Sequence, residues 1–585
     1  MTQLRTHQAV ETISIEGQRV RLAGWVARRR DHGGVTFIDL RDASGVVQVV
    51  ADPAHLRVAS DLRMEACISV DGVVRPRPEG TVNDDLATGA VEVAATTIEL
   101  LSPAEPIPFM IDDRVEIDEQ TRLEYRYLDL RRPRMAANLR ARSKAVAAIR
   151  RTLDERGFLE IETPTLIRST PEGARDMLVP SRLRPGAFYA LPQSPQLFKQ
   201  LLMISGVERY FQIARCYRDE DFRSDRQLEF TQLDLEGAFW DEESVQENIE
   251  ATLVAAVREL RGFDIPRPFP RVTWQESMDL YGVDKPDTRF GMEIVDLTDQ
   301  FRASEFRGFA GAVEAGGVVR GINTGARELA RSAADALVDD AKRLGAKGLV
   351  WIVTEPGGSL RSPVARFLSE TESSAIVERM DAKPGDMLLL VADEWRTAVS
   401  VLGALRLQLG RPSGHEELKF LWVTDFPMFE EGENGLTFLH HPFTSPQDVE
   451  VMASSPLQAI SRAYDVVVNG VELGSGSIRI HDPAVQGQVF EILGISPAEQ
   501  ESRFGWFLKA LRYGTPPHGG FAFGIDRLVM VLQQEINIRE VIPFPKTQSG
   551  FDPLTESPTE VESVQLKELG LKLEVRREAR DVRRE

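Results

Sequence analysis

A run of charged residues between two apolar segments, at positions 214–234, constrains the fold of this chain most strongly. It reads A-R-C-Y-R-D-E-D-F-R-S-D-R-Q-L-E-F-T-Q-L-D and follows Phe211 and Ile213. Alternating apolar residues on both sides predict two strands joined by a long charged loop. A solvated hairpin tip is the simplest interpretation. However, G-G-F-A-F-G-I-D-R-L at 519–528 sets another arginine beside glycines. Because arginine grips phosphates and carboxylates with two parallel hydrogen bonds, the two segments together predict a site for a polyphosphate.

Neither of the common glycine-rich nucleotide loops occurs in the sequence. It contains no G-x-x-x-x-G-K-[ST] and no strand-linked G-x-G-x-x-G. A nucleotide would therefore be held by side chains, mainly arginines.

Length and composition restrict the class of protein. A chain of 585 residues is too long for one core, which predicts three or four domains. No apolar run approaches the roughly 18–20 residues that span a bilayer, and the first ten residues contain no apolar signal-peptide region. Cys67 and Cys216 are too few for a disulfide framework or a cysteine zinc site. These features predict a cytoplasmic protein with no membrane association.

The formal net charge of −20 argues against a chain that coats nucleic acid through bulk electrostatics. It does not exclude a nucleic acid held by local basic patches. The segment A-R-R-R-D at 27–31 is such a patch, and a solvated strand end is the alternative interpretation.

Residues from about 20 to 100 contain short apolar runs separated by the turn signals D-H-G-G and D-A-S-G. Five short strands in this length predict a small barrel of the OB type, a fold that binds single-stranded nucleic acid among other ligands. Phe37 and Gln48 fall on neighbouring strands, where an aromatic ring can stack on a base and an amide can read its edge. The alternative for Phe37 is a place in the barrel core.

Beyond the barrel, S-P-A-E-P-I-P-F at 102–109 is typical of a linker. A helix is predicted from Ser143 as N-cap to Gly157, followed by a strand, F-L-E-I-E-T-P-T-L, in which Pro164 favours an edge or interface. Near position 286 the composition shifts to glycine and alanine. There, 326–344 has helical spacing with Gly345 as C-cap, and L-V-W-I-V-T-E predicts a strand. The residues on the predicted face of that helix are Leu329, Ala333, Leu337, Ala341 and Leu344.

Several longer motifs resemble those of class II aminoacyl-tRNA synthetases, most closely the bacterial-type aspartyl-tRNA synthetases. They are the Pro164 segment, Y-R-Y-L-D-L-R-R-P, T-P-E-G-A-R-D, A-L-P-Q-S-P-Q-L-F-K-Q, R-D-E-D, H-H-P-F-T-S-P, E-L-G-S-G-S-I-R-I and G-I-D-R-L. The resemblance covers nearly the whole chain. It implies a multidomain α+β protein: an OB-fold anticodon-binding barrel, an antiparallel-sheet catalytic domain, and a small inserted α/β domain. The Pro164 segment further implies a homodimer.

The expected boundaries follow from these patterns. They are 1–105 for the barrel, 106–135 for the linker, 136–285 and 416–560 for the two parts of the catalytic domain, 286–415 for the inserted domain, and 561–585 for a charged, partly helical C-terminal extension.

The resemblance implies roles for residues that would bind ATP. Arg218 would hold the α-phosphate, where charge builds as the aspartate carboxylate attacks. Arg527 would bind the γ-phosphate, and Glu220 the adenine amino group, with Gln227 nearby in the same loop. Mg²⁺ would be held by Asp465 and Glu472, because hard oxygen ligands suit that ion. Without the resemblance, these two acids would be interpreted as surface carboxylates.

The resemblance also implies an L-aspartate pocket. Arg479 would take the substrate's side-chain carboxylate as a two-pronged pair, Lys199 would add a second positive charge, and Asp234 would orient them. The remaining contacts would come from Glu172, in a loop that closes on substrate, and from Ser194, Gln196, Gln232 and His440. Because adjacent strand residues face opposite sides, His440 and His441 are not expected to share a metal.

In the barrel, the positions that resemble anticodon readers are Arg30, Phe37, Gln48 and Glu92. Two departures bear on tRNA choice. His32 stands where strictly tRNA(Asp)-specific relatives tend to carry leucine, and Gly80 replaces a bulkier, often basic residue. Both resemble members that also charge tRNA(Asn). A third departure, Leu228 in place of proline, predicts only a less rigid loop.

These features predict ATP-dependent attachment of aspartate to tRNA(Asp) and also to tRNA(Asn). Strict specificity for tRNA(Asp) is the alternative, and a non-catalytic tRNA-binding paralogue is a remoter one. A downstream amidotransferase that converts Asp-tRNA(Asn) is left open. Asparaginyl- and lysyl-tRNA synthetases are rival enzymes, but a lysine pocket would need acids where Lys199 and Arg479 stand.

Overall fold

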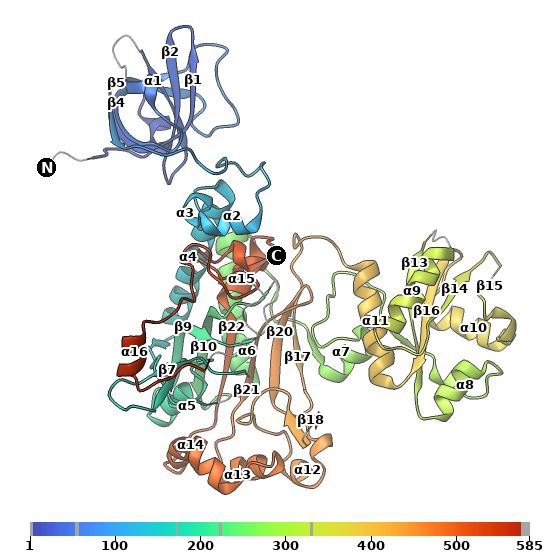
Figure 1. The fold of residues 1–585 in the computed structure, drawn as a ribbon. Helices are drawn as coiled ribbons and strands as arrows, with labels where there is room; N and C mark the ends of the chain where they lie inside the picture. Colours follow the sequence, from blue (N-terminus) through green and yellow to red (C-terminus); the bar gives the residue numbers. More distant parts are fainter. Residues whose placement is uncertain are drawn as a thin grey trace. The chain divides into compact units, whose positions relative to one another are not determined.

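The computed structural model describes residues 4–52, 58–170, 174–220, 225–327, 331–357, 359–433 and 435–574. The chain divides into two compact units, residues 1–136 and 137–585. Figure 1 shows the elements of both units, coloured along the sequence.

The first unit contains a closed five-stranded barrel with the strand order β1-β2-β3-β5-β4. Its strands are β1 (Arg19–His32), β2 (Val35–Arg41), β3 (Val46–Ala51), β4 (Cys67–Pro76) and β5 (Val91–Ser102). Alternate residues such as Ile38 and Leu40 are buried inside the barrel. The predicted OB-type barrel is confirmed. Two short helices, α2 (Glu119–Glu124) and α3 (Arg126–Asp129), follow it.

An eight-stranded sheet with the order β11-β17-β20-β21-β22-β10-β9-β6 dominates the second unit. Its neighbours pair antiparallel except at the two outer pairs, β11 with β17 and β6 with β9. The antiparallel catalytic sheet is therefore confirmed. The strands are β6 (Leu159–Glu160), β9 (Arg209–Tyr217), β10 (Glu229–Ala238), β11 (Arg271–Thr273), β17 (Phe420–Thr424), β20 (Ala463–Val468), β21 (Val471–Ile478) and β22 (His518–Gly524).

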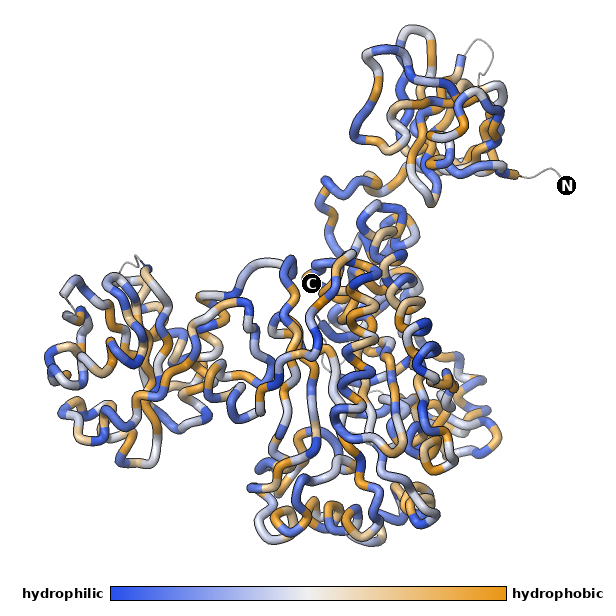
Figure 2. The backbone as a smooth tube through the Cα atoms, turned by 180° about the vertical axis from the view of Figure 1, so that it is seen from behind, coloured by the Kyte–Doolittle hydropathy of each residue, from blue (hydrophilic) through white to orange (hydrophobic). Residues whose placement is uncertain are grey.

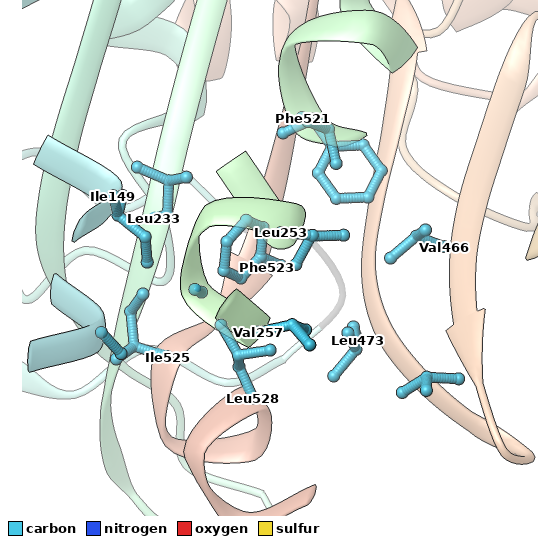
Figure 3. Packing of buried hydrophobic residues seen from close by; sticks show 14 of the residues in the cluster. Ile149, Leu233, Leu253, Val257, Val466, Leu473, Phe521, Phe523, Ile525 and Leu528 are labelled. Carbon is cyan, nitrogen blue, oxygen red and sulfur yellow. The ribbon is translucent and has the colours of Figure 1, made fainter. Parts of the chain in front are cut away.

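One face of this sheet is covered by three helices, α4 (Pro133–Glu155), α6 (Glu242–Arg261) and α15 (Ile525–Leu532). Figure 3 shows Ile149, Leu253 and Leu528 of these helices packed against strand residues such as Leu233 and Phe523. Burial of this apolar surface fixes which way the sheet faces. Polar side chains of the same strands then lie on the opposite face.

The inserted segment forms its own sheet, with the order β12-β13-β16-β14-β15 and antiparallel pairing throughout. Successive residues of β16 point to opposite faces of this sheet. Leu389 belongs to the hydrophobic cluster on one face and Leu390 to the cluster on the other. The strands are β12 (Val295–Asp296), β13 (Val318–Ala326), β14 (Val350–Thr354), β15 (Leu360–Arg361) and β16 (Asp386–Asp393). The helices are α8 (Arg307–Glu314), α9 (Arg331–Arg343), α10 (Glu370–Arg379) and α11 (Trp395–Gly410).

The predicted start of the long helix was wrong. Helix α4 begins at Pro133, ten residues before Ser143, and proline suits a first helical turn because it has no N–H to leave unpaired. The strand predicted after Gly157 is reduced to the two residues of β6.

The predicted helix at 326–344 starts too early, because Ala326 ends β13 and α9 begins at Arg331. Leu344, expected on the buried face, is 49% exposed, and Leu329 lies outside the described residues. In the described part of the charged tail, residues 561–574, α16 (Ser563–Glu568) is helical.

Hydrophobic and hydrophilic segments are interleaved along the chain (Figure 2). Among the described helices, none is both long enough and apolar enough to cross a membrane.

Candidate active site

A cavity of about 1490 Å³ opens on the polar face of the large sheet. Polar side chains of strand β10 form part of the cavity wall. Leu233 and Leu235 point into the core, whereas Gln232, Asp234 and Glu236 alternate with them and lie on the other face. The cavity lining includes most of the residues predicted to bind substrates: Ser194, Gln196, Lys199, Arg218, Glu220, Gln227, Gln232, Asp234, His440, Asp465, Glu472, Arg479 and Arg527. Glu172 lies outside the described residues.

Four buried charges form a network of ion pairs, in the order Asp234–Lys199–Glu236–Arg479, and all of them except Glu236 line the cavity. Lys199 Nζ lies 3.2 Å from Asp234 Oδ1 and 3.3 Å from Glu236 Oε2. Arg479 donates to both oxygens of Glu236, from Nε at 2.9 Å and from Nη2 at 3.2 Å. All four side chains are at most 2% exposed. Burial of this kind is tolerated only because each charge has an opposite partner.

Glu236 was missed by the sequence interpretation, although the signal was present. It continues the two-residue spacing of Gln232 and Asp234 on β10. Space for its carboxylate comes from Gly520 on β22, where an added Cβ would meet Glu236 Oε2 at 1.7 Å. Glycine at this position is therefore required by the close approach of the carboxylate.

The two carboxylates of the network differ in pKa. Burial raises the pKa of Asp234 above its usual value, and Lys199 offsets only part of this. Burial also raises the pKa of Glu236, but Arg479 and Lys199 outweigh it, and the pKa lies below its usual value. Among the described residues, Asp234 Oδ2 and Gln196 Nε2 are buried and have no hydrogen-bond partner. Such atoms at a cavity wall are ready to meet polar groups of a ligand.

Arg479 makes more hydrogen bonds to other protein groups than the sequence led us to expect. Its Nε–Nη2 side is taken by Glu236, and its Nη1 donates to Ser477 Oγ at 2.7 Å. Nη1 also lies 2.7 Å from Nε2 of His441, which is thus the acceptor. Burial lowers the pKa of His441 well below its usual value, and Arg479 adds to this effect. A neutral His441 therefore supports the arginine.

The two histidines lie after β19 (Gly435–Phe438), not on a strand as expected, and both line the cavity. His440 Nδ1 is 3.1 Å from Ser475 Oγ, and its ring packs edge-on against Phe426. Burial lowers the pKa of His440 to about 4. Groups of three or more metal-binding side chains are absent from the described part of the chain.

Asp465 and Glu472 come from neighbouring strands β20 and β21, at a register shift between Val466 and Val467. Burial, reinforced by the charge of Glu472, raises the pKa of Asp465 well above its usual value. Within the described residues Asp465 Oδ1 is buried without a hydrogen-bond partner. Two close carboxylates with a free oxygen fit a divalent cation that takes its other ligands from water and phosphate.

Residues of the charged loop also line the cavity, among them Arg218, Glu220 and Gln227. The Arg218 guanidinium stacks on the Phe230 ring at 5.0 Å. Glu220 accepts a 2.9 Å hydrogen bond from Arg226, which braces the loop. The Gln227 amide exchanges two hydrogen bonds with the backbone of Lys546, at 2.8 and 3.1 Å.

Arg527 lies at the start of α15. Its Nη1 donates to the Glu472 backbone oxygen at 2.6 Å, and its Nη2 lies 3.3 Å from Asp225. Arg527, predicted to bind phosphate, and Glu472, predicted to bind Mg²⁺, therefore lie on adjoining elements.

In the barrel, Phe37 is half-buried on the outer face, so its alternative place in the core was wrong. The residues predicted to contact the anticodon lie opposite one another on neighbouring strands. Arg30 pairs in register with Phe37, and Gln48 with Glu92. Gln48 donates to Glu92 at 2.9 Å, and so does Arg75, which the sequence analysis did not consider. The other barrel residues named in the sequence analysis lie at the surface. Arg30 forms an ion pair with Asp39 at 2.9 Å, and His32 and Gly80 are exposed.

Comparison with known proteins identifies the family. Residues 118–548 match the family of tRNA synthetases class II (D, K and N), and residues 20–101 match the OB-fold nucleic acid binding domain. An aspartate–tRNA(Asp/Asn) ligase of Moorella thermoacetica is 52% identical, over 98% of this chain and 97% of that protein. An aspartate–tRNA ligase of Shouchella clausii is 48% identical, over 97% and 99%.

Solved structures agree in fold. An asparaginyl-tRNA synthetase from Pyrococcus horikoshii, complexed with asparaginyl-adenylate, superposes with a TM-score of 0.57 at 19% identity, covering 92% of this chain and 96% of that one. A putative aspartyl-tRNA synthetase from Leishmania major gives 0.58 at 19% identity, covering 93% and 94%. The chain therefore belongs to the class II tRNA synthetases of the D, K and N group.

Proposed function

We propose that the protein activates L-aspartate with ATP and transfers the aspartyl group to tRNA(Asp) and tRNA(Asn). The observation that carries the proposal is the buried network of Lys199 and Arg479 beside a cavity that also holds Arg218 and Arg527. This arrangement would place a pocket for an anionic amino acid next to a site for a polyphosphate. Relatives about half identical over nearly their full length carry names that agree with it.

In the first step, the α-carboxylate of aspartate attacks the α-phosphorus of ATP and pyrophosphate leaves. No general base is required, because the attacking carboxylate is already ionised at neutral pH. Arg218 would stabilise the charge that develops on the α-phosphate, and Arg527 would hold the γ-phosphate. A Mg²⁺ ion on Asp465 and Glu472 would supply further neutralising charge to the phosphates.

Selection of aspartate would depend on the hydrogens of Arg479 and Lys199 that face the cavity. Asparagine would turn an amide NH₂ toward these donors and leave them unpaired. A site built to hydrogen-bond one group rejects an analogue lacking it by roughly 10⁴–10⁵-fold. Ser194, Gln196, Gln232, His440 and Glu172 would complete the pocket.

In the second step, the 3′-hydroxyl of the terminal tRNA adenosine attacks the activated carboxyl carbon and AMP leaves. The barrel would choose the tRNA. We propose that Phe37 stacks on an anticodon base and that Gln48 and Glu92 read base edges, with Arg30 beside them. The imidazole at His32 and the absence of a side chain at Gly80 would tolerate the third anticodon base of tRNA(Asn).

Aminoacylation with L-aspartate on tRNA(Asp) and tRNA(Asn) transcripts, side by side, tests the proposal. We expect both to be charged. Charging of tRNA(Asp) alone would refute the relaxed specificity, and charging of neither would refute the ligase itself. Asp-tRNA(Asn) must be amidated before it can serve as Asn-tRNA, so an amidotransferase is the implied downstream partner.

We also propose a homodimer formed through the edge of the large sheet at β6. Pro164 is exposed there, and Leu159 and Leu166 are 57% and 51% exposed. Light scattering that finds only monomer at micromolar concentration would contradict this.

A further inference from the structure

A lysine outside the predicted site lines the same cavity as the phosphate-binding arginines. Lys285 lies in the turn after α7 (Trp274–Tyr281), on the segment that leads from the large sheet into the inserted domain. Its Nζ is 3.9 Å from Oε2 of Glu472. Arg527 binds the backbone oxygen of the same Glu472 at 2.6 Å. Glu472 therefore has a cation at each of two groups, Lys285 near its carboxylate and Arg527 at its backbone oxygen.

The ion pair with Glu472 does not explain the position of Lys285. The distance is at the outer limit for a salt bridge, and the Lys285 and Glu472 side chains are 50% and 36% exposed. Such a pair contributes little to stability, because water competes for both charges. The ammonium group is therefore available to a stronger anion.

The backbone that carries Lys285 is, in contrast, firmly held by α11 of the inserted domain. At Gly282 an added Cβ would meet the Val399 carbonyl oxygen at 2.0 Å, so the turn and α11 are in direct backbone contact. Arg406 of α11 donates to the Asp287 backbone oxygen at 2.9 Å. Buried Asp287 also accepts two hydrogen bonds from the Arg289 side chain, at 2.6 and 2.9 Å, and one from the Arg289 backbone N–H at 3.1 Å.

We propose that Lys285 is a further phosphate-binding residue, which contacts the β- and γ-phosphates of ATP and the pyrophosphate that leaves, and that the inserted domain holds it in place. An ammonium group with three rotatable donors suits a leaving group whose charge is spread over several oxygens. When ATP binds, the Lys285 ammonium group would leave its weak contact with Glu472 and bind the phosphate oxygens instead. This inference rests on the proposed ATP-dependent function.

The test compares Lys285→Met and Lys285→Arg with a matched control, Lys419→Met. Lys419 is 49% exposed and pairs with Glu417 at 2.8 Å, but does not line the cavity. We expect Lys285→Met to weaken ATP binding, measured by calorimetry without aspartate, by about 10- to 100-fold, the effect of losing one charged hydrogen bond. The KM for pyrophosphate in the exchange reaction should rise similarly, whereas the KM for aspartate stays within about twofold.

Arginine should restore most of the ATP affinity, and the control should behave as the wild type. ATP affinity unchanged in Lys285→Met would overturn the inference, including when the melting temperature falls, since that result indicates bracing alone. A wild-type chain that binds ATP but does not activate aspartate would refute the proposed function instead, and the ATP affinities of the variants would still decide on Lys285.

The placement by the inserted domain has its own test. Asp287→Asn should weaken ATP binding, and combining it with Lys285→Met should weaken binding by less than the product of the two single effects. Effects that multiply would show that Asp287 does not act through Lys285.

Discussion

Replacement of Glu236 by glutamine removes the one carboxylate that contacts both cations of the buried network. The substitution keeps the size of the side chain but leaves two positive charges, Lys199 and Arg479, with one negative charge, Asp234. Lys199 keeps Asp234 at 3.2 Å. Arg479 keeps only the neutral groups of Ser477 and His441, both at 2.7 Å. The cost of the substitution therefore falls on Arg479.

The size of the effect follows from burial. Arg479 is 2% exposed and Glu236 is fully buried, and breaking a pair of this kind by removing one partner costs about 3–5 kcal/mol. The entropy of unfolding rises with chain length by roughly 2 cal/mol/K per residue, so a unit as large as residues 137–585 loses about 1 °C of melting temperature per kcal/mol. We therefore expect this unit of Glu236→Gln to melt about 3–5 °C below the wild type.

The substrate adds a second readout. In the variant, the side-chain carboxylate of bound aspartate would supply Arg479 with the missing negative charge if the proposed contact between them forms. Saturating L-aspartate should thus raise the melting temperature more in Glu236→Gln than in the wild type, although exchange activity falls because the arginine is less well oriented.

A matched control is Glu242→Gln. Glu242 also makes a two-pronged pair with an arginine, Arg462, at 2.6 and 2.6 Å, but each side chain is 34% exposed. A pair this exposed contributes about 0–1 kcal/mol, so melting should change little. Equal melting of the two variants, or an equal aspartate effect in Glu236→Gln and the wild type, would refute the reasoning.

Three further predictions concern single side chains. Arg218→Ala should abolish ATP–pyrophosphate exchange and leave tRNA binding intact in a filter assay; exchange that survives would exclude the α-phosphate contact, and Arg215→Ala, which removes an exposed pair with a neighbouring glutamate, is the control. His32→Leu should lower charging of tRNA(Asn) relative to tRNA(Asp) by roughly tenfold or more, the discrimination that one base contact supplies; an unchanged ratio of kcat/KM values would assign specificity elsewhere. The folded-state pKa of His440, about 4, lies below its usual 6.5, so the unfolded chain binds the extra proton and stability should fall as pH drops from 6.5 toward 4. The loss should be smaller in His440→Asn, as melting curves at pH 7 and 4.5 would show, and parallel curves would contradict the buried neutral imidazole.

Local signals in the sequence predicted the barrel, whereas the large antiparallel sheet was expected from the resemblance to class II synthetases. Strand alternation and glycine turns mark the barrel. The face of β10 is likewise a local property, and extending its spacing by two residues would have found Glu236. The pairing of Glu236 with Arg479, 243 positions later, depends on the order of strands in the sheet, which no local pattern reveals.

The wrong predictions about secondary structure all concern where a helix or strand begins or ends. Ser143 can cap a helix, but Pro133 starts one earlier, and the buried Met135 and Ala141 extend the apolar face upstream. The strand after Gly157 has strand-like composition, yet only two of its residues pair with β9. Composition states what a segment can form, whereas the length of a strand depends on the partner beside it.

The charge balance of the proposed amino-acid pocket would explain how it prefers an anion and yet is stable without one. Lys199 and Arg479 carry two positive charges, and Asp234 and Glu236 carry two negative ones, so the empty network is neutral in total. The balance is uneven in space, because Glu236 takes the Nε–Nη2 side of the guanidinium and Ser477 and His441 take Nη1, so that one N–H of Nη2 is left among the described contacts. We propose that a substrate carboxylate binds this N–H and the Lys199 ammonium group, and that an amide NH₂ in its place leaves both donors unpaired. Pockets that store an unpaired cation for the same purpose lose stability when empty, so a neutral network with open donors is the less costly arrangement for selecting aspartate.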